Sequence, residues 1–377
     1  MRQALAAPRG NVTLVTAAAD ARDRSPVSAP RVLTRAEGSL GRITLNRPEA
    51  LNALDIGMIR ALRDVLDAWR DDTDVQLVYI DGAGERGLCA GGDVRALYDY
   101  VRAGQAVNAA QFFREEYALN AAIAEYPKPI VTIADGITMG GGIGVAGHAT
   151  IRIVTERSKL AMPETRIGFT PDVGGTRLLA RAPGRLGEYF AMTGRTMTAS
   201  DALYMGFADY YVPSENLEAL REALAFRADP AGPAEIVLLF DETPDASPLA
   251  QARAEWIDEA FSAGSAVEVV ERLRGSTAEE ASATVDLLAE LSPTGLAVTL
   301  DAVREARELP TLRDALAGEY RRVMWFVQQH PDLVEGIRAQ LVDKDRDPKW
   351  QPATVAELAA DAGAGARSFV PALPLWD

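Results

Sequence analysis

Two acidic residues in one short loop are the first candidates for chemistry in this sequence. Glu164 and Asp172 lie in MPETRIGFTPDVGGTRLL (162–179), a segment that glycine and proline interrupt repeatedly. Two carboxyl groups brought together in a loop have split pKa values, so one is ionised while the other keeps its proton, which suits general acid–base chemistry. Taken as isolated residues, Asp172 would more simply be a helix cap and Glu164 a surface charge.

Two glycine-rich turns, AGGD (90–93) and TMGGGIG (138–144), are the second candidates. A glycine turn that enters a helix exposes free N–H groups with the helix dipole behind them. Two such N–H groups on neighbouring units could converge on one oxygen and form an oxyanion hole. The simpler interpretation is that these glycines only make tight turns between strands and helices.

Other reactive residue types carry weaker signals. Cys89 has no evident histidine partner and is expected to be a small buried residue. His148 lies among Gly, Ala and Val, so we expect a packed histidine and not a ligand. The segment RPEALNALD (47–55) by itself predicts only a turn before a helix, and the absence of a GxSxG pattern disfavours a serine hydrolase.

Composition excludes several classes of protein. The 377 residues include 39 basic and 54 acidic side chains, a net charge of −15, which argues against a nucleic-acid partner. One cysteine permits neither an internal disulfide nor a cysteine zinc site, and two histidines argue against a multi-histidine metal site. Charges interrupt every apolar stretch well before the roughly 20 residues that a membrane span needs.

The elements that must position the candidate residues fall into three regions. Residues 1–30 are Ala/Arg-rich but contain Asp20 and Asp23, unlike a transit peptide, so we expect a mostly disordered extension and a cytoplasmic protein. Residues 31–225 show strand–turn–helix twice, with glycines at each turn, which predicts an α/β spiral of stacked ββα units. Residues 226–377 have helical periodicity, which predicts a mainly helical C-terminal region.

Individual elements can be placed within these regions. RVLTRAE and GRITLNRP predict two short strands joined by a turn at 37–41, and DVQLVYIDG and KPIVTIADG predict buried strands. Asp55 is a candidate N-cap for a helix that runs to about Trp69. Ser292 followed by Pro293 predicts a helix start, because serine caps a helix and proline fits its first turn.

Taken together, the motifs resemble a known family. LNRPEALNAL, CAGGD, DGITMGGGIG and MPETRIGFTPDVGG occur in the order and spacing of the crotonase (enoyl-CoA hydratase/isomerase) superfamily. The more selective segments FFREEY (112–117), SPT (292–294) and DKDRDPKW (343–350) closely resemble its 3-hydroxyisobutyryl-CoA hydrolase branch. The resemblance extends over residues 32–355.

The resemblance implies a crotonase-like spiral of ββα units, with a mainly helical C-terminal region, that binds an acyl-CoA thioester. It implies that the backbone N–H groups of Gly92 and Gly141 hold the thioester oxygen. It assigns acid–base work to Glu164 and Asp172 and makes Glu116 a third carboxylate that contacts the substrate. The turn RPEALNAL would line the CoA groove, through Ala50, Asn52 and Ala53. No metal or other cofactor is implied, because coenzyme A is part of the substrate, and the chain is expected to be able to form a homo-oligomer.

One departure from the superfamily pattern bears on the reaction. Hydratases of this superfamily normally use two glutamates, at the places held here by Gly144 and Glu164, and typically have glycine at the place of Asp172. The resemblance therefore implies hydrolysis of a short β-hydroxyacyl-CoA, first of all 3-hydroxyisobutyryl-CoA in valine breakdown. The alternatives are an enoyl-CoA hydratase or isomerase, and a non-catalytic protein that binds acyl-CoA.

Overall fold

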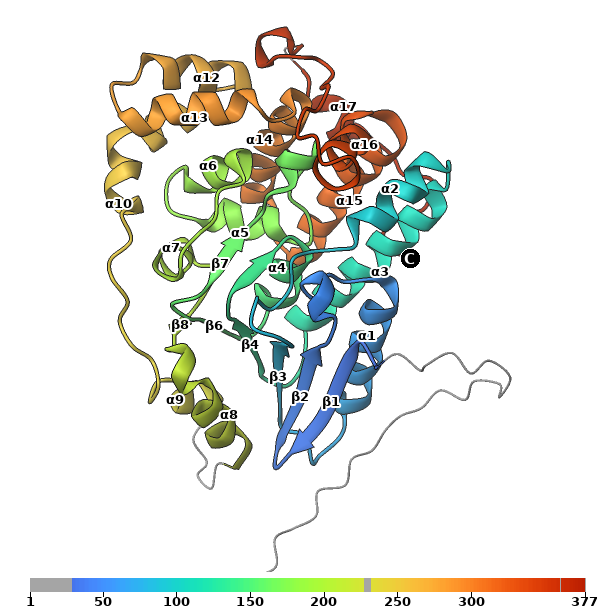
Figure 1. Ribbon diagram of the computed structural model, residues 1–377, viewed down its shortest axis with the longest axis vertical. Coiled ribbons are helices and arrows are strands. Elements are labelled where there is room, and N and C mark those ends of the chain that lie inside the picture. Colours follow the sequence, from blue (N-terminus) through green and yellow to red (C-terminus); the bar gives the residue numbers. More distant parts are fainter. Residues whose placement is uncertain (1–28, 227–231, 360, 377) are drawn as a thin grey trace, which may run out of the picture.

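A central sheet of six strands organises the computed structural model, which describes residues 29–226, 232–359 and 361–376 (Figure 1). The predicted extension at residues 1–30 therefore lies almost wholly outside the described residues. The strand order is β1-β2-β3-β4-β6-β8, with β1 antiparallel to β2 and all later neighbours parallel. The strands are β1 (Val32–Glu37), β2 (Leu40–Leu45), β3 (Leu77–Gly82), β4 (Ile130–Ala134), β6 (Ile151–Val154) and β8 (Tyr210–Tyr211).

A second, two-stranded parallel sheet lies closer to the candidate residues. It pairs β5 (Ile137–Met139) with β7 (Lys159–Ala161), and Met139 lies opposite Ala161. The segment before the first glycine turn joins this sheet through a parallel bridge between Cys89 and Thr138. Because parallel partners advance together, this register carries the two glycine turns forward side by side.

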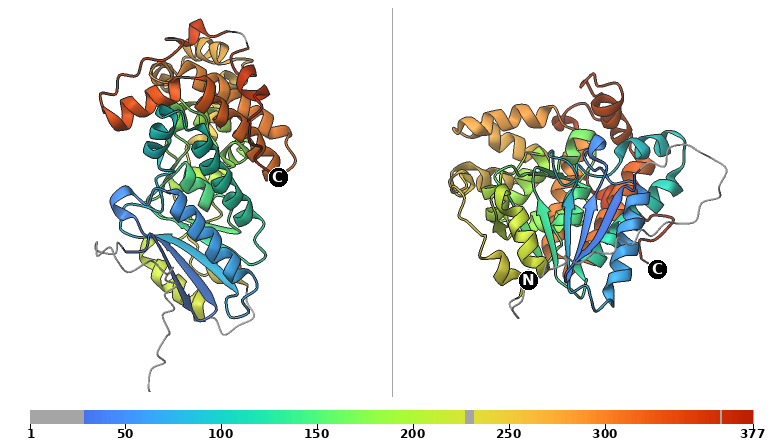
Figure 2. Two further views of the ribbon diagram at one scale, coloured as in Figure 1. Left: turned by 90° about the vertical axis from the view of Figure 1, so that its right-hand side faces the viewer. Right: turned by 60° about the horizontal axis from the view of Figure 1, so that its bottom comes forward.

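Helices cover both faces of the six-stranded sheet, as the continuous buried runs of its central strands β3 and β4 require. On one face, Leu77, Val131 and Ile153 pack with α8 (Leu217–Phe226) and α9 (Pro233–Val237). On the other, Ile43, Val78 and Ile80 belong to the large core that also includes α1 (Ile56–Arg70) and α3 (Ala106–Ala124). Figure 2 shows the sheet between these two layers. The helices of the first half are α1 (Ile56–Arg70), α2 (Val94–Arg102), α3 (Ala106–Ala124), α4 (Gly141–Ala146), α5 (Gly175–Arg181), α6 (Leu186–Thr193) and α7 (Ala199–Met205).

The predicted helix starts are confirmed by their caps. The Asp55 side chain accepts a hydrogen bond from Met58 N at the start of α1. The Ser292 side chain accepts one from Gly295 N at the start of α14, with Pro293 in the first turn. The C-terminal region is mainly helical, as predicted, with α10 (Leu249–Ala252), α11 (Asp258–Phe261), α12 (Ala266–Gly275), α13 (Glu279–Ala289), α14 (Pro293–Glu308), α15 (Leu312–Gln329), α16 (Asp332–Ile337) and α17 (Ala364–Ser368).

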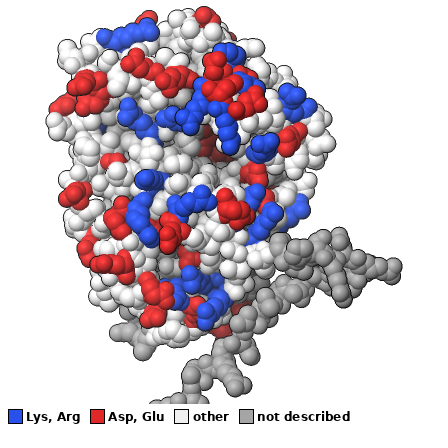
Figure 3. All heavy atoms as spheres, in the orientation of Figure 1, with Lys and Arg blue, Asp and Glu red and all other residues white. Residues whose placement is uncertain are grey.

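The C-terminal helices pack directly on α3, which carries Glu116, and on other helices of the first half. α14 contacts α5 and α6, α15 contacts α3 and α5, and α16 contacts α2. The largest buried apolar cluster therefore contains residues of both regions. No helix in the described part of the chain is long and apolar enough to cross a membrane. Figure 3 shows acidic and basic side chains interspersed on one face of the molecule.

Candidate active site

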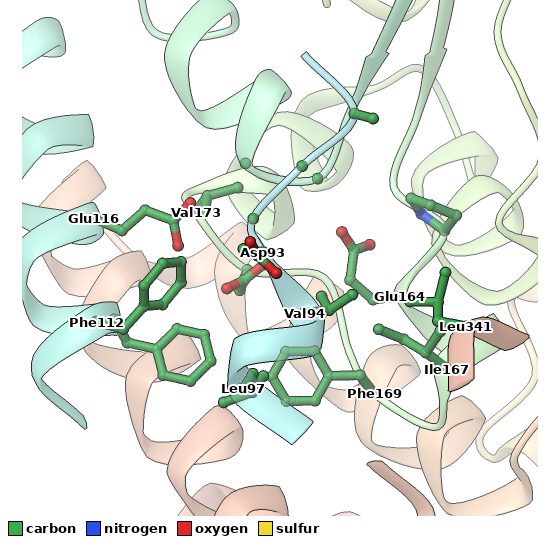
Figure 4. Close-up of a pocket in the computed structure, with 18 residues that line it drawn as sticks. Asp93, Val94, Leu97, Phe112, Glu116, Glu164, Ile167, Phe169, Val173 and Leu341 are labelled. Carbon is green, nitrogen blue, oxygen red and sulfur yellow. The ribbon is translucent and has the colours of Figure 1, made fainter. Parts of the chain in front are cut away.

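A cavity of about 220 Å³ is lined by five of the residues that the sequence singled out, Gly92, Glu116, Gly141, Glu164 and Asp172 (Figure 4). Its floor and sides come from the two glycine turns, α2, α3 and the loop at 163–173. Apolar side chains form much of its wall, from Leu97, Phe112, Phe169, Ile167 and Leu341. Leu341 belongs to the π-helix η5 (Arg338–Val342), so the C-terminal region supplies part of the cavity wall.

The two glycine turns present free backbone N–H groups at the same point. The bridge between Cys89 and Thr138 places Gly92 beside Gly141, because each lies three residues further along its segment. A Cβ atom on Gly141 would lie only 3.1 Å from Gly92 N. Neither the Gly92 N–H nor the Gly141 N–H donates a hydrogen bond to another described residue. Two neighbouring, unpaired N–H groups, one of them in the first turn of α4, are suited to bind a developing oxyanion.

Glu164 and Glu116 approach this point from opposite sides, as Figure 4 shows. Glu164 begins the 3-10 helix η2 (Glu164–Ile167), three residues after β7, and a Cβ atom on Gly140 would lie 3.1 Å from its Oε1. Glu116 lies on α3, and a Cβ atom on Gly141 would lie 2.6 Å from its Oε1. Both carboxyl groups are buried, and Glu164 Oε2 and Glu116 Oε1 have no hydrogen-bond partner among the described residues. Each therefore keeps an oxygen for a ligand.

Asp172 completes the group from the loop between η2 and α5. Its Oδ2 accepts a hydrogen bond of 2.8 Å from the Tyr117 hydroxyl on α3. Tyr117 was not singled out from the sequence, although it is the last residue of FFREEY. Its position directly after Glu116 is the signal that was available, since consecutive helical residues are 100° apart and both can face one cavity.

Burial governs the protonation of these carboxyl groups. It raises the pKa of Glu116 and of Glu164 well above the usual range, and the charge of nearby Asp172 raises both further. Burial also raises the pKa of Asp172 to about 7, although the hydrogen bond from Tyr117 acts in the opposite direction. Three buried carboxyl groups so close together cannot all be ionised near neutral pH. At least one of these groups therefore keeps its proton near neutral pH, and Asp172, with a pKa of about 7, can exchange a proton there, as general acid–base chemistry needs.

Comparison with known proteins places this arrangement in a family. The model of the enoyl-CoA hydratase/isomerase family matches residues 40–364. The chain belongs to the enoyl-CoA hydratase/isomerase family.

Relatives within this family carry two kinds of name. The chain is 41% identical to the mitochondrial 3-hydroxyisobutyryl-CoA hydrolase of Danio rerio, over 88% of each chain, and 39% identical to that of Homo sapiens, over 88% of this chain and 86% of the relative. Among solved structures, a carnitinyl-CoA dehydratase from Mycobacterium thermoresistibile is 46% identical and superposes with a TM-score of 0.86, covering 92% of this chain and 98% of that one. An enoyl-CoA hydratase from Rhodobacter sphaeroides is 40% identical, with a TM-score of 0.84 over 90% and 98%. The predicted resemblance to the hydrolase branch of this family is confirmed.

The position at which hydratases of the family are expected to carry a second glutamate is closed here. A Cβ atom on Gly144 would lie 2.7 Å from Asn120 Nδ2 and 2.8 Å from Val173 Cβ. Real Cβ atoms essentially never approach other heavy atoms this closely. The site thus has neither a carboxylate at 144 nor room for one.

We expect that Gly144→Glu will abolish thioester hydrolysis without producing useful hydration of crotonyl-CoA, alone or combined with Asp172→Gly. The new side chain must displace Val173, which directly follows Asp172. Thioester cleavage and crotonyl-CoA hydration should be measured on the same preparation. Undiminished hydrolysis in either variant would contradict the structural argument.

The turn assigned to the CoA groove lies next to this cavity but does not line it. Ala50, Asn52 and Ala53 are not among the lining residues. The Asn52 amide is used within the turn, accepting from Arg47 N at 2.9 Å and donating to the carbonyl oxygens of Ala83 and Gly87. Leu54 N, just beyond, donates to Gly91 O at 2.8 Å. The turn therefore supports the first glycine turn, and a role in binding CoA stays a prediction.

Cys89 is a buried residue, as expected. Burial raises the pKa of its thiol to about 12, so the reactive thiolate is suppressed at neutral pH. Its structural contribution is the bridge to Thr138 that brings the glycine turns together.

Proposed function

We propose that this protein hydrolyses a short β-hydroxyacyl-CoA thioester, in the first place 3-hydroxyisobutyryl-CoA, to the free acid and coenzyme A. One observation carries the proposal: Glu164 and Asp172 face two unpaired N–H groups in a small cavity that has no space for a hydratase glutamate at Gly144. The names of curated relatives about 40% identical over most of both chains support the same substrate.

The thioester carbonyl oxygen would accept hydrogen bonds from Gly92 N–H and Gly141 N–H. As the carbonyl carbon is attacked, negative charge builds on this oxygen, and one donor of this kind typically contributes about 3–4 kcal/mol. Glu164 is placed to act in either of two ways. As a nucleophile it forms a mixed anhydride and expels the CoA thiolate, which takes up a proton, and water then hydrolyses the anhydride. As a general base it takes a proton from water, which attacks the carbon directly; the C–S bond then breaks and the departing CoA thiolate takes up that proton.

Asp172 would bind the 3-hydroxyl group of the substrate and assist proton transfer, and Glu116 would orient the polar end of the acyl group. Asp172 Oδ2 is bound to Tyr117, and burial keeps the pKa of Asp172 close to neutrality. This combination allows the group to exchange a proton without a large energetic cost.

We expect that Asp172→Asn will reduce hydrolysis severely, and more for a β-hydroxyacyl-CoA than for an unsubstituted acyl-CoA of the same length. A site built to bind a hydroxyl group discriminates strongly through that hydrogen bond. The measurement is kcat/KM for both substrates in the wild type and the variant. An equal loss for both would remove the hydroxyl-binding role and leave only acid–base chemistry.

Incubation of the purified protein with 3-hydroxyisobutyryl-CoA and, separately, with crotonyl-CoA tests the reaction itself. A thiol reagent traps released CoA, while the loss of conjugation in crotonyl-CoA reports hydration. We expect rapid thiol release from the first substrate and negligible hydration of the second. Hydration without thiol release would instead support the enoyl-CoA hydratase activity named for the Rhodobacter sphaeroides relative, and binding without turnover would indicate a non-catalytic protein.

Three further statements belong to the same proposal. The reaction as written uses water and the residues of this chain, so it needs no metal or redox cofactor, and coenzyme A is part of the substrate. We place the protein in the cytoplasm, although the curated relatives are named as mitochondrial. We also propose that it forms a homo-oligomer, which sedimentation analysis would test.

A further inference from the structure

We propose that His148 and Glu319 are positioning residues that hold Asp172 in place by hydrogen-bonding, from two sides, the peptide unit that joins Val173 to Gly174. This inference rests on the function proposed above, in which Asp172 contacts the substrate. Neither residue lines the cavity.

The backbone after Asp172 adopts a conformation that needs external support. Val173 has a φ of +53°, and Gly174 follows with a φ of +78°. A β-branched residue in the left-handed region is a genuine outlier. Such strain persists only where the surroundings hold it, and it often marks a functional site.

The two anchors act on one peptide unit, the one that joins Val173 to Gly174. His148 Nε2 lies 2.7 Å from Val173 O, and Gly174 N–H donates to Glu319 Oε2 at 2.7 Å. The carbonyl and the N–H of this unit point in opposite directions, so the two contacts hold it from both sides. Rotation of the unit would break both hydrogen bonds at once.

Glu319 belongs to α15, and its side chain hydrogen-bonds to residues just after Asp172. Its Oε1 accepts hydrogen bonds from Thr176 N at 3.0 Å and from the Thr176 hydroxyl at 2.5 Å, at the start of α5. It is 1% exposed, and burial raises the pKa of its carboxyl group to about 8. A buried carboxyl group is costly to keep, and its hydrogen bonds all go to the segment that follows Asp172.

His148 links the same peptide unit to the oxyanion-binding turn. It lies two residues beyond α4, the helix that begins at Gly141. A Cβ atom on Gly174 would lie 2.4 Å from His148 Nε2, so only glycine at 174 allows this close approach of the ring. The anchor therefore sets the position of Asp172 relative to the Gly141 N–H, which is the geometry that the reaction needs.

The first experiment compares kcat and KM for 3-hydroxyisobutyryl-CoA in His148→Leu, His148→Gln and Glu319→Gln. We expect His148→Leu and Glu319→Gln to lower kcat at least tenfold with KM within about twofold of wild type, because substrate contacts are untouched. His148→Gln should recover most of kcat, because its amide N–H can still donate to Val173 O.

A matched control separates positioning from general destabilisation. Glu188, also fully buried, lies on α6 and pairs with Arg185 and Arg307 away from the cavity. Glu188→Gln should lower the melting temperature without changing kcat. If it lowers kcat as much as Glu319→Gln does, the positioning role is overturned.

Nitrogen NMR gives a test that needs no substitution at His148 or Glu319. The chain has only two histidines, so His330→Gln assigns both ¹⁵N imidazole spectra. The proposal requires His148 to carry its proton on Nε2, since this nitrogen must donate to a carbonyl oxygen. A proton on Nδ1 alone would overturn it.

The outcomes distinguish this inference from the proposed function. Wild-type kcat in His148→Leu and Glu319→Gln, alongside an inactive Asp172→Asn, would overturn the inference alone. A rise in KM with unchanged kcat would also overturn it, since the residues would then serve substrate binding. Full hydrolysis by Asp172→Asn would overturn the proposed function instead.

Discussion

Glu164→Gln is expected to reduce thioester hydrolysis by roughly 10²- to 10⁴-fold, the usual contribution of positioned acid–base or nucleophilic chemistry. Glutamine keeps the shape of the side chain but has neither a nucleophilic nor a basic oxygen. No residue in the described part of the chain donates a hydrogen bond to Glu164 Oε2, so the substitution removes no hydrogen bond from this oxygen. Turnover of 3-hydroxyisobutyryl-CoA should be measured with affinity for CoA, which should stay nearly unchanged.

Stability measurements support the interpretation of this variant. Burial and the charge of Asp172 raise the pKa of Glu164, so the folded protein binds the carboxyl proton more tightly than the unfolded chain does. Stability from this group is thus present at acid pH and is lost as pH rises through the folded-state pKa. Glu164→Gln should therefore melt no lower than wild type, and its relative stability should be greater at pH 8 than at pH 5. More than about a tenth of wild-type turnover would show that the assigned role is wrong.

Gly141→Val is expected to reduce turnover by roughly 10²-fold or more, the loss typical of one oxyanion donor. A Cβ atom at this position would lie 2.6 Å from Glu116 Oε1, 3.1 Å from Gly92 N and 3.3 Å from Gly91 C. The Glu116 side chain can rotate away, but the Gly91–Gly92 backbone cannot move without disturbing the partner N–H group. The change should therefore separate the two donors. Turnover and thermal unfolding should be measured together.

A second glycine provides the control for this substitution. Gly275 ends α12, and a Cβ atom there would meet nothing within 4 Å. Gly275→Val should leave both turnover and stability close to wild type. A stable Gly141→Val protein with normal turnover would show that Gly141 only makes the turn and that the oxyanion is bound elsewhere.

The residues that could be predicted from sequence are those with local signals. Gly92 and Gly141 stand in glycine runs between a strand and a helix, and Glu164 and Asp172 stand in one loop with a distinctive motif. Local signals also predicted the helix caps at Asp55 and Ser292. Such features depend on a few neighbouring residues, which a single sequence displays directly.

The residues that escaped prediction act through long-range packing. Glu319 is 143 residues beyond Thr176, which it binds, and Leu341 reaches the cavity from the far end of the chain. Nothing in the helical pattern of the C-terminal region marks these positions. The strained backbone at Val173 was also unexpected, because β-branched residues avoid positive φ and glycine follows immediately.

The wall residue Leu341 and the anchor Glu319 have a consequence for the order of events during synthesis. The carboxylates and glycines of the site are all made before residue 175, yet Asp172 lacks the second of its two anchors, Glu319, until α15 emerges, and the cavity has no complete wall until η5 follows. A growing chain thus carries the full set of reactive groups for much of its translation without the enclosure that they need. Hydrolytic activity is therefore expected only near the end of translation. Chains released early should not hydrolyse acyl-CoA thioesters.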